Sequence, residues 1–195
     1  DYQTVHQDFN LEPTCAIFSD DVESGNQGWT AQPPWGITTS KSHSPTHSWT
    51  DSPAGQYSNN QNTSLTSQAF DLSSATGVSL NFWHTYATES GWDFGYVEYS
   101  INGSVWTMVA SYTGSQPDWE EVNIPLPALA GQSNVRIRFR FYSDQSVTND
   151  GWYLDDIQLL SSGSGCITPI PPTADFITNA PVLPGEPVDF INMTH

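Results

Sequence analysis

The chain has 195 residues, in which 4 Lys and Arg stand against 21 Asp and Glu, so its formal net charge at pH 7 is −17. This charge repels a phosphate backbone or an anionic lipid surface, and it excludes nucleic acid as a partner. Aromatic residues make up 13 % of the sequence, including 8 Trp. A disordered acidic chain contains far fewer, so a folded core is expected.

Short segments rich in Val, Ile, Thr and aromatic residues follow one another along the chain, with Gly and Pro between them and almost no helical periodicity. The first clear segment, VSLNFWHTYA at residues 78–87, is predicted to be a core strand. Residues 96–109, YVEYSINGSVWTMV, are predicted to form a β-hairpin, because Asn102 and Gly103 lie between two alternating runs. Strands at this spacing predict an all-β chain folded as an antiparallel jelly-roll β-sandwich.

The segment VRIRFRFYS, residues 135–143, has the most regular alternation in the chain. Its apolar side chains, at every second position, are expected to face the core, and Arg136, Arg138 and Arg140 then project from the opposite face. Three of the four cationic residues of the protein would therefore lie together on one strand face.

The segment DGWYLDDIQL, residues 150–159, is predicted to be a strand with two adjacent acids, Asp155 and Asp156, in its middle. Because side chains alternate between the faces of a strand, one of the two acids would point toward the core. A buried ionised carboxylate needs a partner, since its desolvation is costly. Strict alternation places Tyr153, Asp155, Ile157 and Leu159 on one face, and Leu154, Asp156 and Gln158 on the other.

The composition changes abruptly after Leu160, where SSGSG and then ITPIPP indicate a linker that is flexible in its first half and stiff in its second. Two strand-like pieces follow, which are too few to bury a core of their own. The predicted domain boundaries are an N-terminal extension at residues 1–15, the jelly roll at 16–161, the linker at 162–172 and a partial second β-sandwich at 173–195.

The two cysteines, Cys15 and Cys166, bracket the predicted jelly roll and belong to no C-x-x-C pair, so a zinc or redox motif is not expected. A disulfide between them is predicted, with two unpaired thiols as the alternative, and a stable disulfide indicates an extracellular location. No run of about 18 apolar residues occurs, so membrane insertion is not expected. The sequence opens on Asp1 without an apolar leader, as expected for a mature or trimmed secreted product.

Four separate motifs follow one another along the sequence, namely DDVESGNQGW (20–29), SHSPTHSWTDSPAGQY (42–57), FWHTYATESGWDFGYVEYSINGSVW (82–106) and RIRFRFYSDQSVTNDGWYLDDI (136–157). In this order they resemble the MAM-like jelly-roll domain of secreted bacterial proteins, such as immune inhibitor A type metallopeptidases, subtilisin-like peptidases and choice-of-anchor surface proteins. The sequence departs from the pattern at Ser104, where a second Gly is common. Residues 173–195 resemble the first two strands of a PKD domain through ADF and PGEPVDF, which implies a longer multidomain protein.

The MAM-like resemblance implies a calcium ion between the Glu of the opening motif and the Asp of the closing one, which are Glu23 and Asp155 in this sequence. Asp21, Asp51 and Asp156 are weaker candidate ligands. Calcium suits an acid-rich chain with few cations, because it takes six to eight oxygen ligands. Two alternatives remain open for Asp155, namely acceptance of backbone N–H bonds in a turn and a salt bridge to one of the three arginines.

No catalytic motif is found, since the sequence has neither G-x-S-x-G nor H-E-x-x-H. Glu89, Asp93 and Glu98 are close in sequence, but a glycosidase pair needs a specific separation in a cleft. His43 and His47 have the spacing of two metal ligands on a helix, but a proline between them favours a loop with ordinary polar roles. The chain is therefore not expected to be an enzyme.

Glycan binding would use exposed aromatic rings, and the candidates are Trp35, Trp92 and Trp119, which are predicted to lie in loops. The alternative is that these rings cover the edges of the sandwich. Trp83 and Trp106 are predicted to lie in strands as core residues.

These features predict a non-catalytic, calcium-stabilised adhesion or binding module of a larger secreted or cell-surface protein, with a glycan or a protein surface as its partner. One alternative is a structural subunit of an extracellular fibre that self-associates by strand addition, through residues 1–10 or through the C-terminal strands. Another alternative is an accessory domain of a secreted peptidase.

Overall fold

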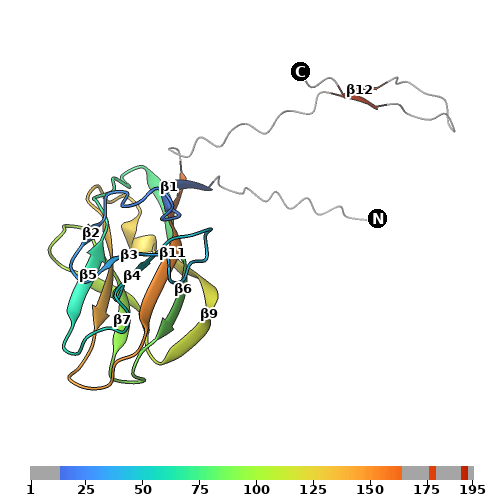
Figure 1. Cartoon of the computed structure of the whole chain (residues 1–195). Helices are drawn as coiled ribbons and strands as arrows, with labels where there is room; N and C mark the ends of the chain where they lie inside the picture. Colours follow the sequence, from blue (N-terminus) through green and yellow to red (C-terminus); the bar gives the residue numbers. More distant parts are fainter. Residues whose placement is uncertain (1–13, 164–175, 179–189, 193–195) are drawn as a thin grey trace, which may run out of the picture.

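A computed structural model describes residues 14–163, 176–178 and 190–192. Residues 14–163 form two antiparallel β-sheets that face each other across a common core (Figure 1). The predicted all-β antiparallel sandwich is therefore confirmed.

Sheet A has the strand order β3-β4-β11-β6-β9, with β1 pairing along the second half of β11. Its strands are β1 (Thr14–Asp20), β3 (Gly36–Thr38), β4 (Ser48–Thr50), β6 (Ala75–Ala87), β9 (Ser115–Pro125) and β11 (Gly151–Gly163). Sheet B has the order β2-β5-β10-β7-β8. Its strands are β2 (Thr30–Ala31), β5 (Asn62–Thr66), β7 (Phe94–Ser100), β8 (Thr107–Tyr112) and β10 (Arg136–Tyr142). Neighbours in both sheets are mostly distant in sequence, so the chain crosses repeatedly between the sheets.

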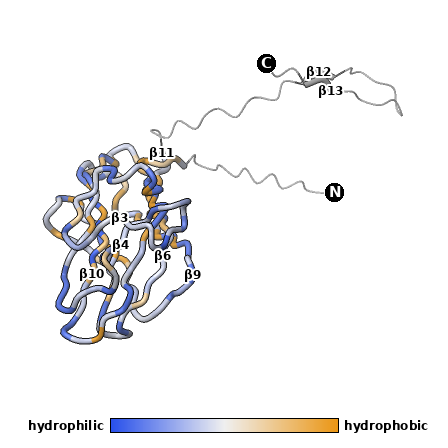
Figure 2. The backbone as a smooth tube through the Cα atoms, in the orientation of Figure 1, coloured by the Kyte–Doolittle hydropathy of each residue, from blue (hydrophilic) through white to orange (hydrophobic). Residues whose placement is uncertain are grey.

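The core lies between the two sheets and takes large side chains from both. Leu80 and Phe82 on β6, Trp152 on β11 and Phe139 on β10 are at most 1 % exposed. Hydropathy changes at short intervals along the sandwich (Figure 2), as expected for strands with only one face on the core. Gly95 on β7 approaches Trp152 so closely that an added Cβ would lie 2.5 Å from the indole Cε3 atom. The largest core side chain therefore depends on a glycine in the facing sheet.

The two most regular sequence predictions are confirmed on sheet B. On β10, Ile137 and Phe141 are at most 2 % exposed, while the three arginines alternate with the buried residues and are only partly covered. Strands β7 and β8 pair in antiparallel fashion around the predicted Asn102–Gly103 turn, in which Gly103 has a φ of +74° that favours glycine.

The alternation predicted for residues 150–159 is wrong beyond Asp155. Asp156 has a φ of +47°, and the pairing of β11 with β6 shifts register directly after Asp155, which marks a β-bulge. The extra residue brings Ile157 onto the core face with Leu154. Asp155 therefore lies on the outer face of β11, where it is nevertheless fully buried.

Strand β11 continues to Gly163, so it extends into the stretch predicted as a linker, 162–172. Strand β12 (Phe176–Thr178) pairs in antiparallel fashion with β13 (Phe190–Asn192), so both strand-like pieces predicted after the linker are strands. The PKD-like assignment stays a prediction, because most of residues 173–195 lie outside the described residues. Within the described ranges the only helical segment is the 3-10 turn η1 (Pro127–Leu129), and no helix there is long and apolar enough to cross a membrane.

Cys15 lies on β1 opposite Ser161 of β11, where the chain enters and leaves the sandwich. Its predicted partner, Cys166, lies outside the described residues, so the disulfide stays a prediction. We expect reduction to raise the intact mass by about two daltons, and we expect neither cysteine to be alkylated in the native, unreduced protein. A mass that does not change on reduction, or alkylation of both cysteines without reductant, would contradict the disulfide.

Candidate functional site

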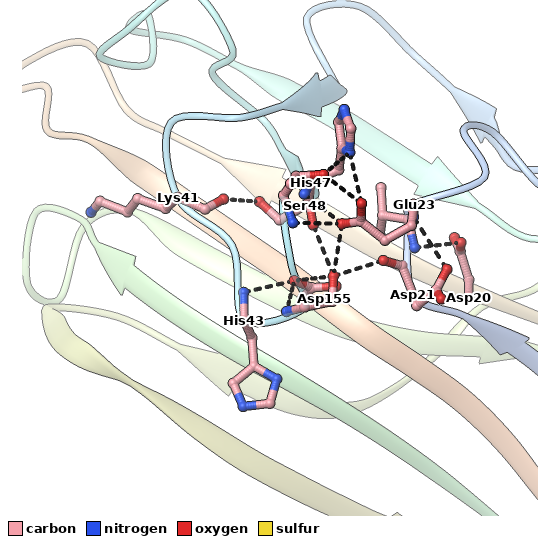
Figure 3. Close-up of polar contacts among 11 residues, drawn as sticks. Asp20, Asp21, Glu23, Lys41, His43, His47, Ser48 and Asp155 are labelled. Carbon is pink, nitrogen blue, oxygen red and sulfur yellow. Dashed lines mark hydrogen bonds and ion pairs between the residues drawn. The ribbon is translucent and has the colours of Figure 1, made fainter.

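Asp155 is covered by residues 39–47, which join β3 to β4 and are called the β3–β4 loop here. Its Oδ2 accepts the backbone N–H groups of His43 at 2.7 Å and Ser44 at 2.8 Å, and its Oδ1 accepts that of Asp156 at 2.8 Å (Figure 3). Burial raises the pKa of the Asp155 carboxyl, although the N–H donors act in the opposite direction. Acceptance of backbone N–H bonds, one of the alternatives for Asp155, is confirmed. A carboxylate has about four lone-pair sites, so it can hold a further partner.

Glu23, in the turn after β1, holds the other end of the same loop. Its Oε1 accepts the backbone N–H groups of Thr46 at 2.8 Å and His47 at 2.7 Å, and its Oε2 accepts the Thr46 hydroxyl at 2.5 Å. The Thr46 hydroxyl, followed by these N–H groups, lowers the pKa of Glu23 to about 2. Glu23 is therefore ionised at neutral pH, and two carboxylates far apart in the sequence fasten the β3–β4 loop to the sandwich.

The hydroxyl of Ser44 lies between these carboxylates, at a point where five oxygen atoms converge. Its Oγ is 2.8 Å from the main-chain oxygen of Asp21, 3.2 Å from Oε1 of Glu23 and 3.3 Å from the main-chain oxygen of His47. The two carboxylate oxygens of Asp155 are 3.0 and 3.1 Å away. One hydroxyl proton cannot satisfy five acceptors. We call these atoms, with the Ser44 hydroxyl, the oxygen cluster.

No Lys or Arg among the described residues pairs with the oxygen cluster. Lys41 pairs with Asp150, although it belongs to the β3–β4 loop. Arg138 and Arg140 both pair with Glu98 on the outer face of sheet B. The alternative of a salt bridge between Asp155 and one of the three arginines is therefore wrong.

The two histidines of the β3–β4 loop contact different carboxylates. Nδ1 of His43 lies 2.6 Å from Oδ2 of Asp156, and Nδ1 of His47 lies 3.1 Å from Oε2 of Glu23. The ring of His43 points away from the cluster (Figure 3). The two rings do not converge on one point, so the predicted polar roles in a loop are confirmed.

The three weaker candidate ligands have different positions. Asp21 gives the oxygen cluster its main-chain oxygen, while its carboxylate accepts the N–H group of Glu23. Asp156 bonds a histidine ring at the margin of the cluster. Asp51 lies elsewhere, fully buried after β4, where its Oδ1 accepts the N–H group of Trp152 at 2.7 Å and its Oδ2 has no partner. Desolvation raises the pKa of Asp51 to about 8.

Sequence reasoning missed Asp20, which is fully buried at the end of β1. Its Oδ2 accepts the indole N–H groups of Trp29 at 2.7 Å and Trp49 at 3.1 Å, and its Oδ1 accepts the N–H group of Val22 at 3.0 Å. A buried indole N–H needs an acceptor, so an acid nine residues before a tryptophan was a usable signal. Asp20 orients the turn that carries Asp21 and Glu23.

The three candidate binding tryptophans lie in three different environments. Trp92, in the turn between β6 and β7, is 61 % exposed, as predicted. Trp35 lies in a loop but is only 5 % exposed, with its ring centroid 6.2 Å from that of Trp152, so its expected exposure is wrong. Trp119 lies within β9 rather than in a loop, and it is partly buried.

Trp83 and Trp106 were predicted to be core residues, and neither belongs to the core. Trp83, on β6, is partly buried and stacks on the ring of His43 with 3.8 Å between centroids. Trp106 precedes β8, and the guanidinium carbon of Arg138 lies 4.0 Å from the centroid of its ring. Both rings therefore support polar groups on the outer faces of the sandwich.

The three carboxylates considered for catalysis do not assemble. Glu98 lies on sheet B between two arginines of β10. Glu89 and Asp93 instead approach Asp144, with one oxygen of each residue within 4.8 Å of the others. Burial, and then the charges of Asp144 and Asp93, raise the pKa of Glu89. Asp93 accepts the hydroxyl of Tyr57 at 2.6 Å, so it holds the loops at this end of the sandwich together.

A family model described as Reelin subrepeat B matches residues 40–159, more than half of the chain. The chain belongs to the Reelin subrepeat B family. The matched part of the Reelin subrepeat B domain contains Ser44 and Asp155 of the oxygen cluster and all strands of sheet B except β2, whereas Glu23 precedes it. Membership supports the predicted jelly-roll domain, and the MAM-like resemblance stays a prediction.

One relative of this Reelin subrepeat B chain is Bacillopeptidase F of Bacillus subtilis (strain 168), which is 26 % identical to it over 168 residues. The match covers 81 % of this chain and 12 % of the relative. The chain therefore spans about 12 % of the length of the curated relative that it matches.

Several solved structures share the fold at low sequence identity. The K1 cleaved adhesin domain of Lys-gingipain from Porphyromonas gingivalis W83 has a TM-score of 0.53 at 17 % identity, covering 77 % of this chain and 99 % of that domain. TmCBM61, solved in complex with beta-1,4-galactotriose, has a TM-score of 0.53 at 14 % identity, covering 73 % and 95 %. The CBM22-1 xylan-binding domain from Paenibacillus barcinonensis Xyn10C has a TM-score of 0.52 at 14 % identity, covering 78 % and 98 %. At these identities the likeness shows the fold alone.

Proposed function

We propose that this chain is a non-catalytic, calcium-stabilised binding module of a larger secreted or cell-surface protein, and that its partner is a glycan or a protein surface. In this proposal calcium fastens the β3–β4 loop to the turn after β1 and to the β-bulge of β11. The outer surfaces of the sandwich then carry the binding function.

The oxygen cluster carries the calcium part of the proposal. It brings the carboxylates of Glu23 and Asp155 together with two main-chain carbonyl oxygens around the Ser44 hydroxyl, and no Lys or Arg of the described residues neutralises it. Carboxylate and carbonyl oxygens in such numbers are the ligands that calcium prefers, so the residues present fit the ion. Glu23, Asp155 and the main-chain oxygens of Asp21 and His47 would hold it.

The binding part of the proposal is supported by the fold and by one exposed ring. Proteins that share the fold include an adhesin domain, a domain solved with galactotriose and a xylan-binding domain. Trp92 is 61 % exposed at one end of the sandwich, and an exposed aromatic ring on a rigid scaffold is a frequent contact for a ligand. Glycans are therefore the first class of ligand to test.

A second candidate function is that of an accessory domain in a secreted peptidase. The similarity to Bacillopeptidase F favours it, because this chain matches only 12 % of that protein and so corresponds to one part of a much larger chain. Such a domain would bind or position a substrate for a catalytic domain elsewhere. The fibre alternative has no comparable support and stays a prediction.

We expect millimolar calcium to raise the Tm of the chelated protein by roughly 3–6 °C, because a site with a Kd near 10⁻⁴ M gains about 1.4 kcal/mol at this concentration. Differential scanning calorimetry with and without chelator measures the rise. Glu23→Gln is expected to remove most of it, since the amide has lost the negative charge. Glu121→Gln is the matched control, because Glu121 is an exposed residue on β9, away from the cluster. A Tm of the parent that does not respond to calcium, or an equal rise in both variants, would contradict the calcium site.

A further inference from the structure

The outer face of sheet B carries a groove of about 390 Å³ that no sequence motif indicated. It lies where residues of β2 and β5 approach the turn between β7 and β8. The lining residues used below are Gln32, Asn102, Gly103, Trp106 and Arg136. The volume lies within the range that proteins use for small ligands, which is roughly 300–1,000 Å³.

Arg136 is the unpaired cation of the described part of the chain. The other two arginines of β10 share Glu98, and Lys41 pairs with Asp150. The side chain of Arg136 has no ion pair or hydrogen bond to any described residue, although the protein carries 21 acids. Its side chain packs along the Asn102–Gly103 turn, where a Cβ on Gly103 would lie 3.4 Å from Nε of Arg136. The guanidinium group is therefore positioned in the groove with its donors unused.

The two amide side chains of the groove also present donors. Oε1 of Gln32 accepts the N–H group of Ser64 at 3.1 Å and its hydroxyl at 3.0 Å. Oδ1 of Asn102 accepts the N–H groups of Ser104 and Val105, both at 2.9 Å. Because backbone donors occupy both amide oxygens, the NH₂ groups of Gln32 and Asn102 remain for a ligand. Three donor groups from three segments therefore line one groove, and the ligand must supply the acceptors.

Trp106 gives the same groove an aromatic wall. The guanidinium group of Arg138 lies 4.0 Å above its ring and is itself held by Glu98, so the ring has a supported orientation. An aromatic wall beside a few fixed polar groups is the common form of a small-ligand site. The ring suits the C–H face of a sugar, and the three donors suit its oxygen atoms.

We propose that this groove binds a saccharide that carries an isolated carboxylate, with the guanidinium group of Arg136 on the carboxylate and Trp106 against the sugar ring. Arginine matches a carboxylate because its planar fork donates two parallel hydrogen bonds. The net charge of −17 disfavours densely charged polyanions, so the ligand class is a mainly neutral glycan with occasional uronic acid units. This inference rests on the proposed glycan-binding function and adds the site and the class of sugar.

The test uses a xylo-oligosaccharide with one glucuronic acid branch, and the same oligosaccharide after reduction of its carboxyl group to the alcohol. Isothermal titration calorimetry in calcium is expected to show at least about tenfold tighter binding of the acid form to the parent protein, which corresponds to about 1.4 kcal/mol. Arg136→Gln is expected to bind both forms alike, and Trp106→Ala to weaken both. Lys41→Gln removes the same charge from the β3–β4 loop, away from the groove, and is expected to keep the preference.

Two results would overturn the inference while the proposed function stands. They are equal binding of the acid and the reduced form by the parent, and a preference for the acid form that survives in Arg136→Gln. The parent could instead bind neither form and migrate without retardation in gels that contain xylan or β-1,4-galactan. This result would contradict the proposed glycan binding itself. The Tm of each variant in calcium shows that the compared proteins are folded.

Discussion

Replacing Asp155 with alanine is expected to lower the free energy of unfolding by roughly 3 kcal/mol, because three partly buried backbone N–H groups lose their acceptor at once. Burial raises the pKa of this carboxyl, so part of the gain from the bonds already offsets desolvation of the charge. Urea unfolding in chelator measures the loss without any contribution from calcium. The same measurement in calcium is expected to give a larger difference between parent and variant.

The matched control for Asp155 is its neighbour. Asp156→Asn also removes one negative charge from the bulge, and asparagine tolerates the positive φ of this position. Its carboxylate is partly exposed and bonds a histidine ring, so we expect a change below about 1 kcal/mol. Equal losses in the two variants would mean that the charge of the bulge, and not the N–H acceptor, is what the fold requires.

The sequence predicted the strands whose alternation is regular. On β10, apolar and cationic side chains alternate strictly, and the buried face is the one expected. The hairpin of β7 and β8 was also predicted, although its pairing ends at Tyr99 and Thr107, so Asn102 and Gly103 lie within a longer loop in which only Gly103 has a positive φ. In both cases the information is local, since each residue needs only its neighbours along the strand to show which face it occupies.

The β-bulge of β11 was not predictable from alternation. Its signal is an aspartate at a φ of +47°, and Asp156 has the same side chain as the preceding residue, which takes ordinary strand geometry. The bulge explains how a strand with two adjacent acids can keep both of them out of the core. It returns Ile157 to the core and leaves Asp155 outside, where the β3–β4 loop rather than the other sheet buries it.

The candidate site was predicted in part, through Glu23 and Asp155 from the family resemblance. The loop that joins them was not, because SHSPTH contains no apolar residue that would indicate burial. Ser44 and Thr46 contribute through hydroxyl and backbone groups, which leave no distinctive pattern in a sequence. The predicted exposure of Trp35 was wrong for a related reason, since Trp35 lies in a loop that is folded onto the core.

The parent is expected to lose stability between about pH 6.5 and pH 8. Replacing Asp51 with asparagine is expected to abolish most of this loss. Desolvation, with a smaller contribution from the charge of Asp150, raises the pKa of Asp51 from 3.8 to about 8. The unfolded chain releases this proton near pH 4. The folded state therefore holds nearly one more proton at pH 6.5 and about half a proton more at pH 8, and stability falls as the pH rises through this window. Asparagine keeps the oxygen that accepts the N–H group of Trp152.

The contribution of His84 to stability changes with pH in the opposite direction, and this sets the pH range for the measurement. Burial lowers its pKa from 6.5 to about 4, so the unfolded state binds more protons between these values and stability rises with pH there. Above pH 6.5 this slope decreases toward zero, and it is the same in the parent and in Asp51→Asn, so it cancels in their difference. One pKa unit corresponds to about 1.36 kcal/mol, so the stability difference between parent and Asp51→Asn should change by about 2 kcal/mol from pH 6.5 to pH 8.

Asp150→Asn is the control for Asp51, because it removes an adjacent carboxylate whose side chain is 40 % exposed and pairs with Lys41. This variant leaves the buried Asp51 carboxyl in place, so it is expected to keep nearly the slope of the parent. Urea unfolding of the three proteins at pH 6.5 and pH 8 gives the comparison. A parent whose slope equals that of Asp51→Asn would mean that Asp51 is ionised in the folded state. Its unpartnered Oδ2 would then require a cation at that position, which the described residues do not supply.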